Sequence, residues 1–275
     1  MVEIFQAVIL GFIQGMTEFL PISSTAHLIV VPWFFGWQGV VASLPFDLAL
    51  HIGTSLAVIG FFWRDWVRLF LSFLRNLPGG TKKIWQETES RLFLLLALGS
   101  IPAAIAGVFL ENIVENSFRK DMVLITSVVI IFALVLYWAD SRIGKRKVEK
   151  VTLRDSLAVG FAQVLALIPG VSRSGITITA GLLAGLDREA ATRFSFLLST
   201  PIIVGASLFK FKDIIKEGGF GDHFDIFLVG SLASAVSGWI AIKFLLSFVQ
   251  KNSFRVFVVY RLVVGVALLL VTIAR

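Results

Sequence analysis

Apolar residues run along this chain in segments long enough to cross a membrane, and polar residues gather between them. Six segments of this kind are predicted to be transmembrane helices: 46–63, 91–110, 121–139, 194–209, 226–246 and 256–274. About 20 consecutive apolar residues span the hydrocarbon core of a bilayer as a helix. Segments such as the last one lack the polar face that a soluble helix needs. The pattern therefore predicts an all-α integral membrane protein.

Two further apolar segments, about 11–27 and 160–177, are each broken by proline and serine. We expect each of them to enter the membrane and return to the same side as a re-entrant helical hairpin. Both carry ionisable residues at membrane depth, among them Glu18 and Arg173. Such residues are costly in lipid and by default indicate a functional site.

The two broken segments repeat each other. Four residues of the first segment recur 149 positions later in the second. Gly11, Phe12, Gln14 and Ser23 correspond to Gly160, Phe161, Gln163 and Ser172. Residues 1–143 and 150–275 are therefore predicted to be two copies of one unit, each a re-entrant hairpin plus three spans. Three crossings invert the second copy, which gives the inverted-topology architecture of many transporters, with the site between the copies.

The charge distribution adds an orientation. The net charge is +7, but 17 of the 25 Lys and Arg lie in four short loops: 64–91, 141–154, 187–193 and 243–255. The positive-inside rule places these loops in the cytoplasm, with both termini and the opening of the first hairpin outside. The charge thus reflects topology, and no nucleic-acid partner is expected. The chain has no cysteine, which excludes disulfides and thiolate metal sites.

The first break carries groups used in catalysis. Gln14 and Glu18 are four residues apart and share one helix face. His27 follows in the first turn of the next helix, after three hydroxyl residues that can cap it: Ser23, Ser24 and Thr25. A carboxylate, hydroxyls and an imidazole within ten residues predict acid–base or nucleophilic chemistry.

The second break predicts an anion site. Gly170 allows a close approach of backbone amides to a ligand, and a helix N-terminus favours negative charge. Arg173 adds a planar donor set suited to phosphate. Further hydrogen bonds are expected from three hydroxyl groups: Ser172, Ser174 and Thr177.

Together the breaks predict a phosphoester or diphosphate site that faces lipid. A carboxylate beside a phosphate calls for a divalent cation, and Mg²⁺ or Ca²⁺ prefer oxygen ligands. Glu18 and Gln14 are the candidate ligands. Ser24 is favoured as the nucleophile with His27 assisting, while attack by His27, or by water that His27 activates, stays open.

These motifs resemble those of a known family. Gln14-x-x-x-Glu18 resembles the Glu/Gln-x-x-x-Glu motif of the undecaprenyl-diphosphate phosphatases of bacitracin-resistance type. The run 169–177 is similar to their Pro-Gly-x-Ser-Arg-Ser-x-x-Thr motif, and 23–27 fits as well. The resemblance covers essentially the whole chain. Gln14 stands where a second carboxylate is found in other members.

The resemblance implies a multi-pass enzyme of the bacterial cytoplasmic (inner) membrane. It implies hydrolysis of undecaprenyl diphosphate to the monophosphate on the outer face with a divalent cation, which recycles the lipid carrier for cell-wall synthesis. The alternative is a lipid-carrier transporter that uses the same phosphate-binding loops, since inverted repeats are a transporter design. His51 and Arg261 lie inside predicted spans without an assigned role. The oligomeric state, a homodimer included, is left open.

Overall fold

The computed structural model describes residues 2–113, 118, 121–216 and 223–274, and in these residues the chain forms helices and no β-strand. The α-helices are α1 (Val2–Phe19), α2 (Ser24–Phe35), α3 (Leu44–Asn76), α4 (Gly80–Gln86), α5 (Thr88–Ile113), α6 (Met122–Asp140), α7 (Leu153–Val164), α8 (Arg173–Leu183), α9 (Arg188–Lys216), α10 (Phe224–Phe248) and α11 (Arg255–Ala274).

Among the described residues, seven helical segments are long and apolar enough to cross a membrane. Six of them coincide with the predicted spans to within a residue or extend beyond them, and the seventh is α1, the first arm of the first broken segment. The prediction of an all-α integral membrane protein is confirmed. The helix that contains the predicted span 46–63 is longer than the span, because α3 continues to Asn76; after Pro45 no proline interrupts the chain until Pro78.

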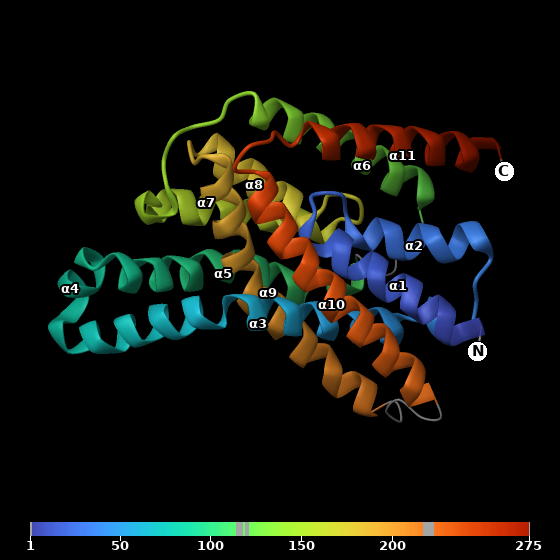
Figure 1. Ribbon diagram of the computed structural model, residues 1–275, viewed down its shortest axis with the longest axis horizontal. Coiled ribbons are helices and arrows are strands. Elements are labelled where there is room, and N and C mark those ends of the chain that lie inside the picture. The colour runs from blue at the N-terminus through green and yellow to red at the C-terminus, as the bar shows by residue number, and fades with distance from the viewer. Residues whose placement is uncertain (1, 114–117, 119–120, 217–222, 275) are drawn as a thin grey trace.

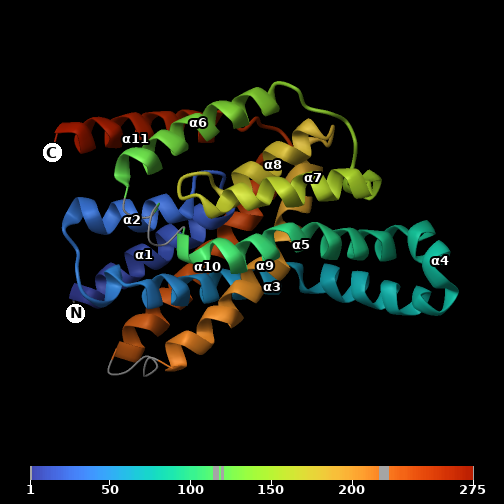
Figure 2. The same ribbon diagram turned by 180° about the vertical axis from the view of Figure 1, so that it is seen from behind.

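The two broken segments form helical hairpins that meet at their tips. α1 and α2 turn back on each other at residues 20–23, and α7 and α8 do so at residues 165–172. In Figure 1 the first hairpin comes in from the right and the second from the left, and Figure 2 shows the same arrangement from behind. A hydrogen bond of 3.0 Å from Ser174 Oγ to the Leu20 carbonyl joins the two turns.

Glycines let the first arm of each hairpin lie directly against another helix. A methyl group on Gly11 of α1 would collide with the carbonyl of Gly230 on α10. A methyl group on Gly160 of α7 would collide in the same way with the carbonyl of Gly99 on α5. Small residues permit this backbone approach in membrane helices. The arm from each half of the sequence thus packs on a helix from the other half.

Ion pairs gather at one end of the helices. Arg146 donates to both carboxylate oxygens of Asp155 at 2.9 and 3.0 Å, and Lys147 Nζ lies 2.7 Å from Asp187 Oδ2. The loop that holds these cations lies at the left of Figure 1, whereas both ends of the described chain lie at the right. These two ion pairs thus lie at the end of the bundle, away from the hairpin tips.

Candidate active site

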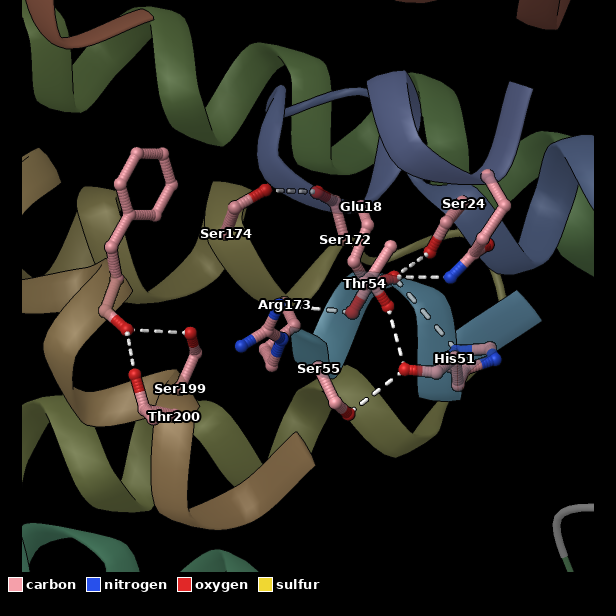
Figure 3. A network of polar contacts seen from close by, with 12 residues as sticks. Glu18, Ser24, His51, Thr54, Ser55, Ser172, Arg173, Ser174, Ser199 and Thr200 are labelled. Carbon is pink, nitrogen blue, oxygen red and sulfur yellow. Dashed lines mark hydrogen bonds and ion pairs between the residues drawn. The ribbon is translucent and has the colours of Figure 1, made fainter. Parts of the chain in front are cut away.

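Glu18, at the end of α1, connects the two hairpins. Its Oε2 accepts hydrogen bonds from Ser24 Oγ at 2.5 Å and from Gln14 Nε2 at 3.2 Å. Its Oε1 accepts from Arg173 Nη2 at 2.9 Å, across 155 positions of sequence (Figure 3). Both members of the Glu18–Arg173 ion pair are largely buried, at 7% and 14% exposure of their side chains. The predicted meeting of the carboxylate loop with the arginine loop is therefore present in the structure.

The two hairpin turns share an unusual backbone conformation. Ser23 has φ 75° and Ser172 has φ 73°, and they are the two non-glycine residues with positive φ in the described chain. Such a conformation is sparsely populated and costs on the order of 1–3 kcal/mol per residue. Each serine immediately precedes a helix, so the turn places Ser24 at the start of α2 and Arg173 at the start of α8.

A cavity of about 250 Å³ opens beside these residues. Its polar lining is Glu18, Ser23, Ser24, Thr25, Asp47, His51, Gln163, Ser172, Arg173 and Ser207. Its apolar lining is Leu44, Leu48, Ala103, Ala166, Leu167, Ile168, Ile202, Ile203 and Ala206. The N-termini of α2 and α8 both reach the cavity, and helix N-termini favour anions. The lining suits a ligand with an anionic head and an apolar chain.

Several buried polar atoms at the site have no hydrogen-bond partner within the described residues. They are Arg173 Nη1, Gln14 Oε1 and both amide atoms of Gln163. Leaving a buried donor or acceptor unpaired costs about 1–3 kcal/mol. Such groups in a native protein call for an explanation, and a ligand that completes their hydrogen bonds is one.

His51 belongs to this site, although the sequence left it unassigned. It lies on α3, lines the cavity, and its Nε2 is 3.8 Å from Glu18 Oε2. Its Nδ1 donates to the Asp47 carbonyl at 2.8 Å. That bond leaves Nε2 as the nitrogen that faces the carboxylate. The sequence feature that could have identified His51 is an ionisable residue inside an apolar span.

His27 lies elsewhere. Its Nδ1 donates to the Ser23 carbonyl at 2.7 Å, and its Nε2 accepts from the Tyr260 hydroxyl at 2.7 Å. The two rings are stacked, with centroids 5.8 Å apart, and they line a separate small cavity with Arg261. Both ring nitrogens are engaged away from Ser24, so the contacts do not support the predicted direct role of His27 in catalysis.

Three residues predicted to bind phosphate make contacts at or next to the second turn. Thr177 Oγ1 donates to the Arg173 carbonyl at 2.8 Å and lies 2.6 Å from Ser195 Oγ. Ser174 bonds to the first hairpin. Gly170 has φ 100° and packs against the carbonyl of Ile125. None of the three lines the cavity, whereas Ser23, Thr25 and Ser172 do.

Arg261 also connects the two hairpin turns. Its buried guanidinium donates to four backbone carbonyls, those of Pro21, Val129, Gly170 and Val171, at 2.8–3.3 Å. Pro21 belongs to the first turn, and the two residues 170 and 171 belong to the second. Carbonyl partners leave no mark in a sequence, so only the presence of an arginine in the last span pointed to a role.

A divalent cation fits the residues present only in part. No cluster of three or more His, Cys, Asp or Glu side chains suited to a metal occurs in the described chain. The unpaired Gln14 Oε1 and the neighbouring Glu18 carboxylate are nevertheless oxygen donors of the type that Mg²⁺ and Ca²⁺ prefer. Such an ion would complete its ligands with phosphate oxygens and water, as Mg²⁺ commonly does.

Comparison with known proteins supports one family. A chain from Thermodesulfovibrio yellowstonii named undecaprenyl-diphosphatase is 45% identical over 99% of each sequence. A protein of the same name from Pelotomaculum thermopropionicum is 49% identical over 99% of this chain and 98% of its own. A third, from Moorella thermoacetica, is 47% identical over 95% of each. The family model described as "Bacitracin resistance protein BacA" matches residues 7–267. The chain therefore belongs to the BacA family of bacitracin resistance proteins.

Proposed function

We propose that this protein is a membrane phosphatase that hydrolyses undecaprenyl diphosphate to undecaprenyl phosphate and inorganic phosphate. The observation that carries the proposal is the contact of Glu18 with both Ser24 and Arg173 at a cavity with an apolar wall. The names of the relatives give the substrate. A transporter would need a phosphate-binding loop but has no use for a hydroxyl hydrogen-bonded to a buried carboxylate, so the transporter alternative is not favoured.

In the proposed reaction Ser24 is the nucleophile and Glu18 its base. Ser24 Oγ attacks the terminal phosphorus, and the proton of the Ser24 hydroxyl passes to Glu18 Oε2. This carboxylate oxygen already accepts a hydrogen bond from that hydroxyl. The bond from this phosphorus to the bridging oxygen breaks, and undecaprenyl phosphate leaves with the bond's electron pair. Water then attacks the phosphoserine: its oxygen joins phosphorus, one of its protons restores the Ser24 hydroxyl, and Glu18 passes the proton it took to the departing inorganic phosphate. Glu18 is thus proposed to assist Ser24, the role that the sequence analysis gave to His27.

Arg173 holds the transferred phosphoryl group. Its Nη2 stays on Glu18, and its unpaired Nη1 is free to donate to a phosphoryl oxygen. Phosphoryl transfer depends mainly on positioning and on neutralisation of charge. The N-termini of α2 and α8 add their partial positive charge at the same place.

A divalent cation, Mg²⁺ or Ca²⁺, is part of the proposal. Glu18 and Gln14 would hold it, and it would neutralise phosphate charge next to the carboxylate. The single carboxylate in this set predicts weak binding without substrate.

The proposed arrangement in the membrane follows the two-copy reading of the sequence. Residues 1–143 and 150–275 are two inverted copies, supported by the matching Gly11–Gly230 and Gly160–Gly99 contacts. The proposed location is the cytoplasmic membrane, with the termini and the opening of the site on the outer side.

The test is release of inorganic phosphate from undecaprenyl diphosphate by purified protein, with Mg²⁺ or Ca²⁺ and with a chelator. The variants are Arg173→Ala and, as a matched control, Arg193→Ala. In the wild type Arg193 pairs with Asp65, outside the candidate site. We expect cation-dependent release that Arg173→Ala abolishes and the control retains. Folded protein that releases no phosphate would overturn the proposal in favour of the transporter.

A further inference from the structure

Gln163 is a buried amide that no part of the proposed reaction uses. It lies on α7, is 2% exposed, and lines the same cavity as Arg173 and Ser24. Both its Nε2 and its Oε1 lack a hydrogen-bond partner among the described residues. A side-chain amide carries two N–H donors and an acceptor oxygen, so this residue leaves all of its hydrogen-bonding capacity unused.

The repeat explains why Gln163 has no partner of its own. Gln14 occupies the matching position in the first hairpin, and it donates to Glu18 four residues further along. The residue four positions after Gln163 is Leu167, whose side chain cannot accept a hydrogen bond. The second copy therefore keeps the amide but lacks the carboxylate that satisfies it in the first copy.

The surroundings of Gln163 favour an anion as its partner. Arg173 Nη1 is also buried and unpaired, and the N-terminus of α8 lies in the same lining. Water could satisfy one amide in a polar cavity, but the neighbouring lining is apolar at Ala166, Leu167 and Ile168. Phosphate oxygens accept hydrogen bonds from guanidinium and amide donors alike.

We propose that Gln163 is a substrate-binding residue whose amide Nε2 donates to a diphosphate oxygen on the Arg173 side of the cavity. The proposal rests on the phosphatase function above and adds to it a donor from the second hairpin. The same chemistry would bind the diphosphate of the lipid and inorganic pyrophosphate, and released phosphate more weakly.

The test compares Gln163→Met with Gln250→Met. Methionine has nearly the same shape without the amide. Gln250 is exposed just after α10, where its Nε2 donates to Glu189 Oε1 at 3.4 Å. We expect Gln163→Met to lower kcat/KM for undecaprenyl diphosphate by roughly 10- to 100-fold, mainly through KM, as the loss of a hydrogen bond to a charged group does. Its melting temperature should be unchanged or raised, because removing an unpaired buried amide does not destabilise the fold.

A second readout separates binding from catalysis. Inorganic pyrophosphate should raise the melting temperature of the wild type and of Gln250→Met, but less that of Gln163→Met. Wild-type kinetics in Gln163→Met, or a loss of activity that follows a fall in melting temperature, would overturn the proposal. If the wild type releases no phosphate yet shows the Gln163-dependent pyrophosphate shift, the phosphatase proposal fails and the assignment of Gln163 stands.

Discussion

Arg173 pairs with a carboxylate and also presents a second donor to the cavity, and the second of these depends on the shape of its guanidinium. One nitrogen pairs with Glu18 at 2.9 Å, and another is unpaired at the cavity. A lysine ammonium could keep the pairing with the carboxylate, but it lacks the fork that reaches a second acceptor.

Arg173→Lys is therefore expected to lower kcat/KM for undecaprenyl diphosphate by about 10- to 100-fold, because one charge-assisted hydrogen bond to phosphate is lost. Steady-state kinetics of the purified variant measure this. The melting temperature serves as the control and should change little. A lysine variant with full activity would show that the second nitrogen has no part in binding.

Ser23 offers a test of backbone strain at the first turn. Its φ of 75° suits glycine better than serine, and its side chain makes no capping bond to α2. Ser23→Gly should therefore raise the free energy of unfolding by about 1 kcal/mol. Ser23→Ala keeps the strain and should not. Thermal denaturation in detergent compares the two, and equal melting temperatures would contradict the strained geometry.

Single residues also show where sequence reasoning stops. Glu18 and Arg173 could be predicted, because a charged residue in an apolar segment indicates a functional site whatever the direction of its side chain. The choice between His27 and His51 could not, since it depends on how α2 and α3 are rotated about their axes. Packing against Tyr260 decides this for His27, and Tyr260 is 233 positions away.

At the level of helices, the close approach of α1 to α10 supports the position of the first hairpin. Gly11→Ala should lower the free energy of unfolding by about 1–3 kcal/mol, because a methyl group there meets the backbone of Gly230. Gly160→Ala should do the same against Gly99. Thermal or denaturant unfolding in detergent measures both.

Gly107 provides the matched control. It lies within α5, and among the described residues no atom outside its own stretch of helix lies within 4 Å of the place that a methyl group would take. Gly107→Ala should leave stability unchanged or raise it by up to about 1 kcal/mol through helix propensity. Equal losses at residues 11 and 107 would mean that α1 and α10 are not in close contact.

The helices themselves were largely predictable, because hydrophobic length dictates a membrane span. The six spans and both breaks could be read from the chain, and each corresponds to a helix or turn in the structure. The extension of α3 to Asn76 was missed, since a helix can continue into water once charged residues follow the apolar ones. The Arg261 contacts were missed because backbone carbonyls carry no sequence signal.

For the whole molecule, the charge distribution predicts which end faces the cytoplasm. The chain has no cysteine, so a single introduced thiol reports one position. In intact cells a membrane-impermeant maleimide should label Gln38→Cys, near the end that holds the termini. It should label Ser141→Cys, in the basic loop 141–154, only after lysis. The reverse pattern would invert the proposed orientation and move the opening of the site to the cytoplasm.

The central claim is that the two hairpin turns form one phosphatase site in which Ser24 attacks phosphorus. The most direct test is the initial rate of phosphate release from undecaprenyl diphosphate by the wild type, Ser24→Ala and Ser247→Ala. Ser247 is a matched control, because its hydroxyl bonds to Lys243 within exposed turns of α10. The account predicts a loss of at least about 1,000-fold in Ser24→Ala, as loss of a nucleophile brings, and wild-type rates in the control. A Ser24→Ala protein that keeps its rate to within about tenfold would contradict it.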